Sequence, residues 1–157
     1  MKEIELIIPV TSKSYEELDA TERRLVDAAR KAVDGSYAPY SNFHVGAAIL
    51  LENGEIATGA NQENVAYPSG TCAERSACFW AGANYPGVPF EMIAVAAVGT
   101  DGKPTPTPTA PCGACRQALL EYETLSGHHV PVLLIGAETI YRLPSVQSLL
   151  PLAFTEF

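Results

Sequence analysis

Three of the four cysteines in this chain stand at spacings that suit a metal site. Cys112 and Cys115 are three residues apart, which places both on one face of a helix. Cys72 lies at the start of another predicted helix, so all three sulfurs can reach a cation beyond the ends of two helices. Zinc favours thiolates, and a site with three protein ligands leaves the fourth position for water, as catalytic zinc sites do. The pattern therefore predicts a catalytic zinc site.

The remaining cysteine and the histidines do not complete this ligand set. Cys78 follows Cys72 by six residues, which is about 240° around a helix and nearly two turns away, so we expect a small buried side chain there. None of the histidines stands at a ligand spacing, and we expect surface or packing roles for His44, His128 and His129.

Glu74 has two interpretations. Thr71-x-x-Glu74 is the pattern of a capping box, in which the glutamate bonds back to the first residues of its own helix. Alternatively, side chains splay around a helix N-terminus, so Cys72 and Glu74 both point at a metal beyond the helix end, where the carboxylate moves protons without binding the metal. Together with Pro111-Cys112-x-x-Cys115, the second interpretation matches a zinc deaminase signature with cysteine in the position that histidine often holds.

Hydrophobic periodicity predicts elements that place these residues at helix N-termini. It indicates helices over 14–33, 71–83, 112–123 and 145–150, and strands over 44–51, 55–60, 92–98 and 130–135. Asn53-Gly54 is a hairpin signal between the first two strands. The alternation predicts an α/β fold with helices packed on a sheet, a three-layer sandwich if both faces are covered.

Composition limits the classes of function. The 157 residues indicate one domain, and a hydrophobic content of 47% with 18% charged residues is that of a globular protein. A net charge of -8 argues against a nucleic-acid substrate or an anionic membrane partner. No apolar run approaches the roughly 18–20 residues that span a bilayer, and the N-terminus lacks a signal-peptide pattern. We expect a cytoplasmic protein with reduced cysteines.

Longer stretches extend the pattern beyond the cysteines. In order, they are Tyr40-Ser41-Asn42-Phe43-His44-Val45-Gly46-Ala47-Ala48, Gly59-Ala60-Asn61-Gln62-Glu63-Asn64, Cys72-Ala73-Glu74-Arg75 and Pro111-Cys112-Gly113-Ala114-Cys115-Arg116-Gln117. Together they resemble the cytidine deaminase family in its small, three-cysteine, homotetrameric form. The resemblance covers about residues 18–154 of a single domain over 1–157, with 1–13 as an N-terminal extension. It implies an α/β/α sandwich with a mixed sheet and one zinc per subunit at the N-termini of two helices.

The resemblance also implies residue roles at the zinc site. Cys72, Cys112 and Cys115 bind zinc, and Glu74 is the proton shuttle. Three thiolates on Zn²⁺ leave a formal charge of -1, so the site needs nearby positive charge. Two helix N-termini supply part of it, and Arg75 tunes the site by donating to a ligand sulfur, unless it is a surface arginine.

For the nucleoside, the resemblance implies five contacts. Asn61 and Glu63 bind ribose hydroxyls, Phe43 stacks on the pyrimidine, the Ala73 backbone meets the base carbonyl, and Phe154 completes the pocket of a neighbouring subunit. A core aromatic is the alternative interpretation of Phe43, and from the residues alone a solvated polar loop is the ordinary interpretation of Asn61 and Glu63.

Two segments depart from the family pattern. The run 66–70 carries Pro68 and Gly70 directly before the second helix, which leaves open whether Tyr67 contacts a partner subunit. The Pro/Thr-rich loop 103–111 is longer than usual, so we expect it to reshape the mouth of the site.

The function expected from these observations is hydrolytic deamination of cytidine and deoxycytidine to uridine and deoxyuridine, with release of ammonia, for pyrimidine salvage. One alternative is a deaminase of a cytosine-containing antibiotic such as blasticidin S, and Asn61 and Glu63 favour the nucleoside over it. Another is a non-enzymatic, zinc-stabilised module, which the open ligand position and Glu74 disfavour.

Overall fold

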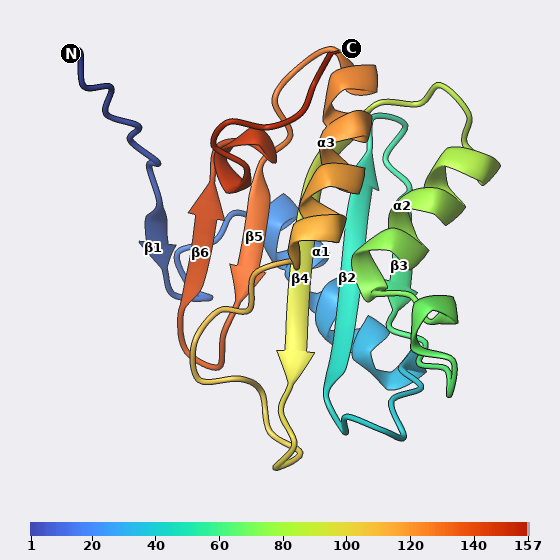
Figure 1. The fold of residues 1–157 in the computed structure, drawn as a ribbon. Coiled ribbons are helices and arrows are strands. Elements are labelled where there is room, and N and C mark those ends of the chain that lie inside the picture. Colours follow the sequence, from blue (N-terminus) through green and yellow to red (C-terminus); the bar gives the residue numbers. More distant parts are fainter. Residues whose placement is uncertain (157) are drawn as a thin grey trace.

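The computed structural model describes residues 1–156 and is built on one six-stranded sheet (Figure 1). Its strands are β1 (Thr11–Lys13), β2 (His44–Leu51), β3 (Ile56–Ala60), β4 (Phe90–Val98), β5 (Val132–Ile135) and β6 (Ile140–Leu143). Their order across the sheet is β1-β6-β5-β4-β2-β3. Only β4 and β5 run parallel among these neighbouring strands, and the other pairs are antiparallel, so the sheet is mixed, as predicted.

Helices cover both faces of the sheet. Helix α1 (Ala20–Ala32) lies on one face, and α2 (Ala73–Asn84) and α3 (Gly113–Ser126) lie on the other (Figure 1). Successive residues of a strand point to opposite faces, and β2 accordingly sends Ala47 into the core beneath α2 and α3 and Ala48 into the core beneath α1. The predicted three-layer α/β/α sandwich is confirmed. No helix in the described chain is long and apolar enough to cross a bilayer.

Small residues let α2, which begins directly after Cys72, approach the sheet closely, and this contact fixes the position of the helix. A Cβ atom on Gly59 of β3 would lie 2.6 Å from the Ala73 carbonyl oxygen and closer still to the Ala77 amide nitrogen. Ala73 and Ala77 are both fully buried on the side of α2 that faces the sheet. Glycine is needed at 59 because any side chain would push the helix outward.

The first and last predicted helices are shorter than expected. Helix α1 begins only at Ala20, because Asp19 is its N-cap: the Asp19 carboxylate accepts from the Glu22 amide at 2.8 Å, and the Glu22 carboxylate accepts from the Asp19 amide at 3.2 Å. The prediction of a helix from residue 14 was therefore wrong. At the C-terminal end, residues 145–150 form only a 3₁₀ turn over Gln147–Leu149.

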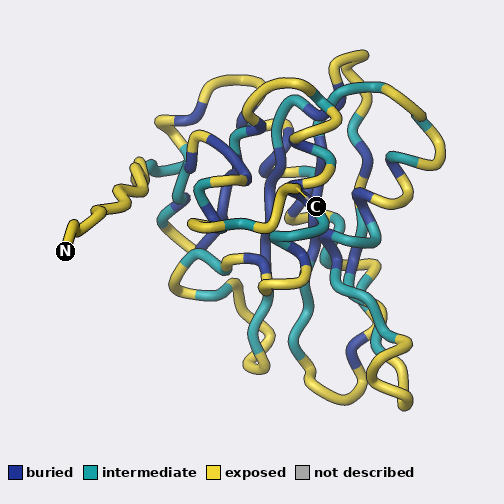
Figure 2. The backbone as a smooth tube through the Cα atoms, turned by 45° about the horizontal axis from the view of Figure 1, so that its top comes forward, coloured by how far each residue is buried: buried dark blue, intermediate teal, exposed yellow. Residues whose placement is uncertain are grey.

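Sequence periodicity did not indicate β1 or β6. The two strands pair with each other, and a buried carboxylate ties them to α1: Glu22 binds Lys13 Nζ at 2.8 Å and Arg142 Nε at 3.0 Å. Residues 1–10 precede β1, have no regular structure and lie exposed, away from the body of the protein (Figure 2).

Candidate active site

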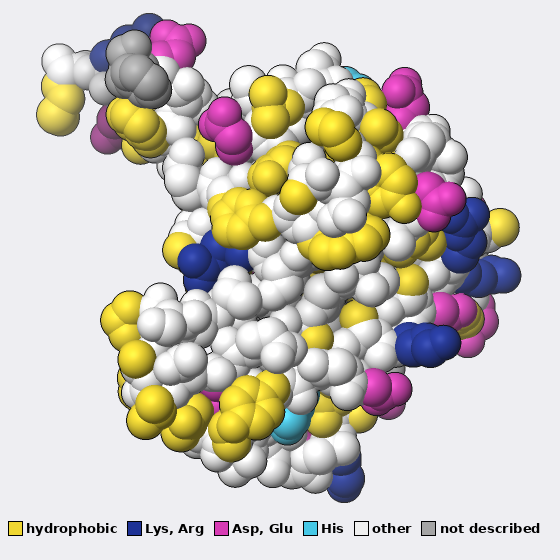
Figure 3. Space-filling model, turned by 90° about the vertical axis from the view of Figure 1, so that its right-hand side faces the viewer, with side chains coloured by type: hydrophobic (Ala, Val, Ile, Leu, Met, Phe, Trp, Pro, Cys, Tyr) yellow, Lys and Arg dark blue, Asp and Glu magenta, His cyan; other side chains and the backbone are white. Residues whose placement is uncertain are grey.

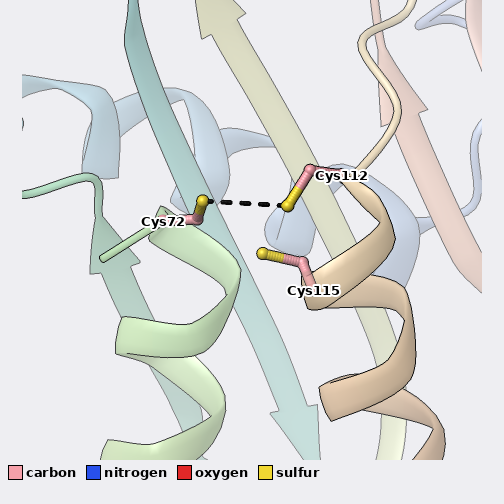
Figure 4. Close-up of side chains that lie close together, drawn as sticks. All are labelled: Cys72, Cys112 and Cys115. Carbon is pink, nitrogen blue, oxygen red and sulfur yellow. Dashed lines mark hydrogen bonds between the residues drawn. The ribbon is translucent and has the colours of Figure 1, made fainter. Parts of the chain in front are cut away.

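The structure brings the three predicted cysteine ligands together. Cys72 is the N-cap of α2, Cys112 is the N-cap of α3, and Cys115 lies in the first turn of α3. Neither N-cap side chain makes a capping bond to the backbone of its own helix, and the three Sγ atoms all lie within 4.8 Å of one another (Figure 4). Zn–S bonds of about 2.3 Å in a tetrahedron separate sulfurs by roughly 3.8 Å, and Cys72 Sγ lies 4.0 Å from Cys112 Sγ. The donor set and its spacing fit zinc.

The local charges favour thiolates at this point. The Cys115 thiol and the Arg75 guanidinium donate to Cys72 and lower its pKa to about 5. Arg75 Nη2 lies 3.7 Å from Cys72 Sγ, and its hydrogen bonds to the sulfurs raise the pKa of Arg75. The N-termini of α2 and α3 both lie at the three sulfurs, so the partial positive charge of each helix end adds to the positive charge of the Arg75 guanidinium.

Glu74 does not cap its helix. Cys72 holds the N-cap position, and the Thr71 hydroxyl donates to the Cys72 carbonyl oxygen at 3.5 Å, so the capping-box interpretation was wrong. The Glu74 side chain is buried, and this burial raises its pKa. A buried carboxyl group with a raised pKa beside three candidate metal ligands is suited to proton transfer.

A pocket of about 430 Å³ opens beside the cluster, a size typical of small-molecule sites. It is lined by Tyr40, Ser41, Asn61, Gln62, Glu63, Asn64, Tyr67, Gly70, Thr71, Cys72 and Arg75. Figure 3 shows the surface hollowed between two groups of hydrophobic side chains on the side of the molecule that carries α2 and β3. Three predicted substrate contacts, Phe43, Ala73 and Phe154, are not among the lining residues of this single chain.

Glu63 presents an ionised carboxylate to the pocket. Its oxygens accept from the Tyr40 amide at 2.9 Å, from the Ser41 amide at 3.2 Å and from the Ser41 hydroxyl. The hydroxyl contributes most to lowering the pKa of Glu63. Tyr67 packs edge-to-face on Tyr40, with ring centroids 5.9 Å apart, so both rings flank this carboxylate on the pocket wall.

The side chain of Asn61 is held by three hydrogen bonds within the protein. Its Oδ1 accepts from Ser36 Oγ at 2.6 Å and from the Val45 amide at 2.8 Å, while its Nδ2 donates to the Phe43 carbonyl oxygen at 2.9 Å. An amide side chain has two donor hydrogens, so one Nδ2–H remains for a ligand. No sequence signal indicated that Ser36 takes part, because it lies 25 positions from Asn61.

The C-terminal residues lie along α3. Gln117 Nε2 donates to the Phe154 carbonyl oxygen at 2.9 Å, and the Phe154 ring is 67% exposed. Arg116, one residue after Cys115, bonds the carbonyl oxygens of Pro111 and Leu149 at 2.8 and 2.9 Å. These bonds tie the segment before the Cys112 cap and the C-terminal segment to the same helix.

Three further expectations can be compared with the structure. Cys78 is fully buried, as expected, and burial raises its pKa to about 12. The run 66–70 forms a 3₁₀ turn over Tyr67–Ser69 beside the pocket. No residue of the loop 103–111 is among the lining residues of this pocket, and the Thr105 carbonyl oxygen accepts from the Ala137 amide at 2.8 Å, which holds the loop against the β5–β6 connection.

Comparison with known proteins agrees with this geometry. The family model described as "Cytidine and deoxycytidylate deaminase zinc-binding region" matches residues 19–126. Cytidine deaminases from Halalkalibacterium halodurans and Sporosarcina psychrophila are 40% and 42% identical to the chain. The matches span 83% and 85% of the chain and 92% and 90% of those proteins.

Solved structures show the same similarity. Cytidine deaminase from Burkholderia pseudomallei superposes with a TM-score of 0.70 at 41% identity, over 83% of this chain and 97% of that one. Cytidine deaminase from Mycobacterium tuberculosis superposes with a TM-score of 0.66 at 34% identity, over 88% of this chain and all of that one.

Proposed function

The chain belongs to the cytidine and deoxycytidylate deaminase family, and on this premise we propose that it is an enzyme that deaminates cytidine. In full, the proposed reaction is hydrolysis of cytidine and deoxycytidine to uridine and deoxyuridine with release of ammonia, in pyrimidine salvage in the cytoplasm. One observation carries the proposal: the buried Glu74 lies beside the three-sulfur cluster, and Cys72 of that cluster lines a pocket whose wall includes Asn61 and Glu63.

One zinc ion per subunit is proposed at Cys72, Cys112 and Cys115. When bound there, zinc supplies Lewis-acid chemistry that makes water a nucleophile at neutral pH. Three thiolates more than balance the charge of the ion, and the two helix N-termini and Arg75 offset the excess negative charge.

Glu74 is proposed to move the protons of the reaction. It takes one proton from the attacking water and passes it to N3 of the pyrimidine ring, and it then carries the second proton of that water to the departing amine. A carboxyl group does both best when its pKa approaches neutrality, and burial shifts the pKa of Glu74 in that direction. The Ala73 backbone directly before it, at the first helical position of α2, is proposed to meet the base carbonyl.

The sugar and the base are proposed to bind through the pocket wall. The ionised Glu63 accepts from a ribose hydroxyl, and the remaining Nδ2–H of Asn61 donates to a ribose oxygen. Phe43 is proposed to stack on the pyrimidine, and its carbonyl oxygen is already fixed by Asn61.

A homotetramer is proposed, in which Phe154 enters the pocket of a neighbouring subunit. The exposed ring, the backbone anchor on Gln117 and the position of Phe154 outside its own pocket support this role. The net charge of -8 supports a small nucleoside rather than a nucleic acid or an anionic membrane as the partner.

The test is to incubate the zinc-loaded protein with cytidine and follow the ultraviolet absorbance change together with ammonia release. We expect equal amounts of uridine and ammonia, and loss of both in Cys112→Ala, which removes a ligand. Turnover of blasticidin S but not of cytidine would replace the proposed substrate, and turnover of neither by folded, zinc-loaded protein would contradict enzymatic function.

A further inference from the structure

A chain of side-chain hydrogen bonds runs from His44 through Ser36 to Asn61, a residue of the pocket wall. Ser36 Oγ lies 2.6 Å from Asn61 Oδ1 and 3.0 Å from His44 Nδ1. Neither Ser36 nor His44 lines the pocket, so any effect of either on a ligand passes through Asn61.

The direction of these bonds follows from the donors available. Asn61 Nδ2 donates to the Phe43 carbonyl oxygen, which identifies the other terminal atom of Asn61 as the acceptor Oδ1. A serine hydroxyl has one hydrogen, and Ser36 gives it to that oxygen. Ser36 Oγ must then accept from His44, so Nδ1 of His44 carries a hydrogen.

These bonds leave Asn61 one orientation. A flip of its amide would place the NH₂ group against the Val45 N–H, a donor facing a donor, and would turn Oδ1 toward the Phe43 carbonyl oxygen. The hydroxyl of Ser36 adds a second donor at Oδ1. Asn61 and Glu63 both line the pocket, so the second N–H of Asn61 Nδ2 is the donor left for a ligand there, and the Glu63 carboxylate is an acceptor on the same wall.

We propose that Ser36, supported by His44, is a positioning residue that locks Asn61 with its free N–H toward the sugar of the nucleoside. The inference rests on the proposed function, since it assumes that the ligand carries hydroxyl groups at this wall. Donor and acceptor side by side match a hydroxyl, which accepts from Asn61 and donates to Glu63.

The test measures KM and kcat for cytidine, and the Kd of uridine by calorimetry, for wild type, Ser36→Ala and Ser36→Thr. Loss of one neutral hydrogen bond corresponds to a few-fold effect, so we expect KM and Kd to rise about threefold to tenfold in Ser36→Ala, with kcat within about twofold. Ser36→Thr keeps the hydroxyl and should restore both values. Ser145→Ala, which removes a buried hydroxyl bonded to Ser148 away from the pocket, is the matched control and should leave both unchanged.

A double-variant cycle separates positioning from general loosening of the fold. When Asn61 is already alanine, adding Ser36→Ala should raise the Kd of uridine no further, because the residue on which Ser36 acts is gone. The inference is overturned if Ser36→Ala leaves KM and Kd unchanged, if it lowers kcat alone, or if it weakens binding equally with and without Asn61. Failure of wild type to convert cytidine contradicts the proposed function instead, and uridine binding, which needs no turnover, still tests the role of Ser36. Absence of both cytidine conversion and uridine binding in wild type would overturn both.

Discussion

Replacing Gly59 by alanine should weaken zinc binding without touching a ligand. The new Cβ atom would lie 2.6 Å from the Ala73 carbonyl oxygen, about 0.8 Å short of ordinary contact, and closer still to the Ala77 amide. Both neighbours are backbone atoms of α2, so the whole helix must move outward by about that distance. Overpacking of this kind costs about 1–3 kcal/mol, which corresponds to roughly 2–4 °C in Tm per kcal/mol for a chain of this length.

The displacement also separates the ligands. Cys72 moves with α2, whereas Cys112 and Cys115 stay on α3, and zinc–ligand distances tolerate only about 0.2 Å. We expect the Kd for zinc to rise by about tenfold to a hundredfold, the range found when the support of a ligand is disturbed.

The assay is competition for zinc with a chelator of known affinity, with thermal unfolding measured in parallel. Gly113→Ala is the matched control, since Gly113 lies between two ligands but a Cβ there meets nothing within 4 Å. We expect Gly113→Ala to bind zinc as wild type does. A Gly59→Ala protein with wild-type zinc affinity and Tm would refute the claim that contact with β3 fixes Cys72.

Three further outcomes are expected. Glu22→Gln should lower the free energy of unfolding in urea by about 1–3 kcal/mol, because it weakens a buried carboxylate bound to Lys13 and Arg142; a loss equal to that of the exposed Glu3→Gln would contradict this. Ser41→Ala should let the pKa of Glu63 rise toward its ordinary value. The ionised Glu63 carboxylate stops accepting from the substrate as the pH falls through its pKa, so KM for cytidine should begin to rise at a higher pH in the variant than in wild type. If KM rises at the same pH in both proteins, the Ser41 hydroxyl does not control the ionisation of Glu63. In native, metal-free protein at pH 8, iodoacetamide should modify the exposed Cys112. Cys78 should react only after unfolding, because burial raises its pKa to about 12. Equal rates of modification of the two cysteines, measured by mass spectrometry, would contradict the burial of Cys78.

Local chemistry made part of the fold predictable. The strand over 44–51 has the predicted bounds, and Gly54 adopts the positive φ of 86° that the Asn53-Gly54 turn requires. β1 and β6 could not be found in this way, because Thr11–Lys13 is a short polar run and Ile140–Leu143 is only four residues long. β1 becomes a strand through its pairing with β6, and β6 through its pairing with both β1 and β5, while the Glu22 ion pairs hold the two strands to α1.

The candidate site, too, was only partly predictable from the sequence. The cysteines were identified because spacing on a helix dictates which sulfurs can share a metal, and the structure places all three within 4.8 Å. The capping box at Thr71 was a second interpretation of Glu74 that local sequence could not exclude. It is wrong because the helix begins one residue later than a capping box at Thr71 requires. Ser36 gave no sequence signal, since its role depends on the approach of Asn61 across 25 positions.

Turnover of cytidine by Glu74→Gln tests the central claim most directly. Glutamine keeps the size of the side chain but cannot exchange a proton, so the variant should retain its zinc and its fold. We expect kcat to fall by at least about 100-fold, the lower end of what a positioned proton-transfer group contributes. A zinc-loaded Glu74→Gln protein that converts cytidine within threefold of wild type would contradict the assignment of proton transfer to Glu74.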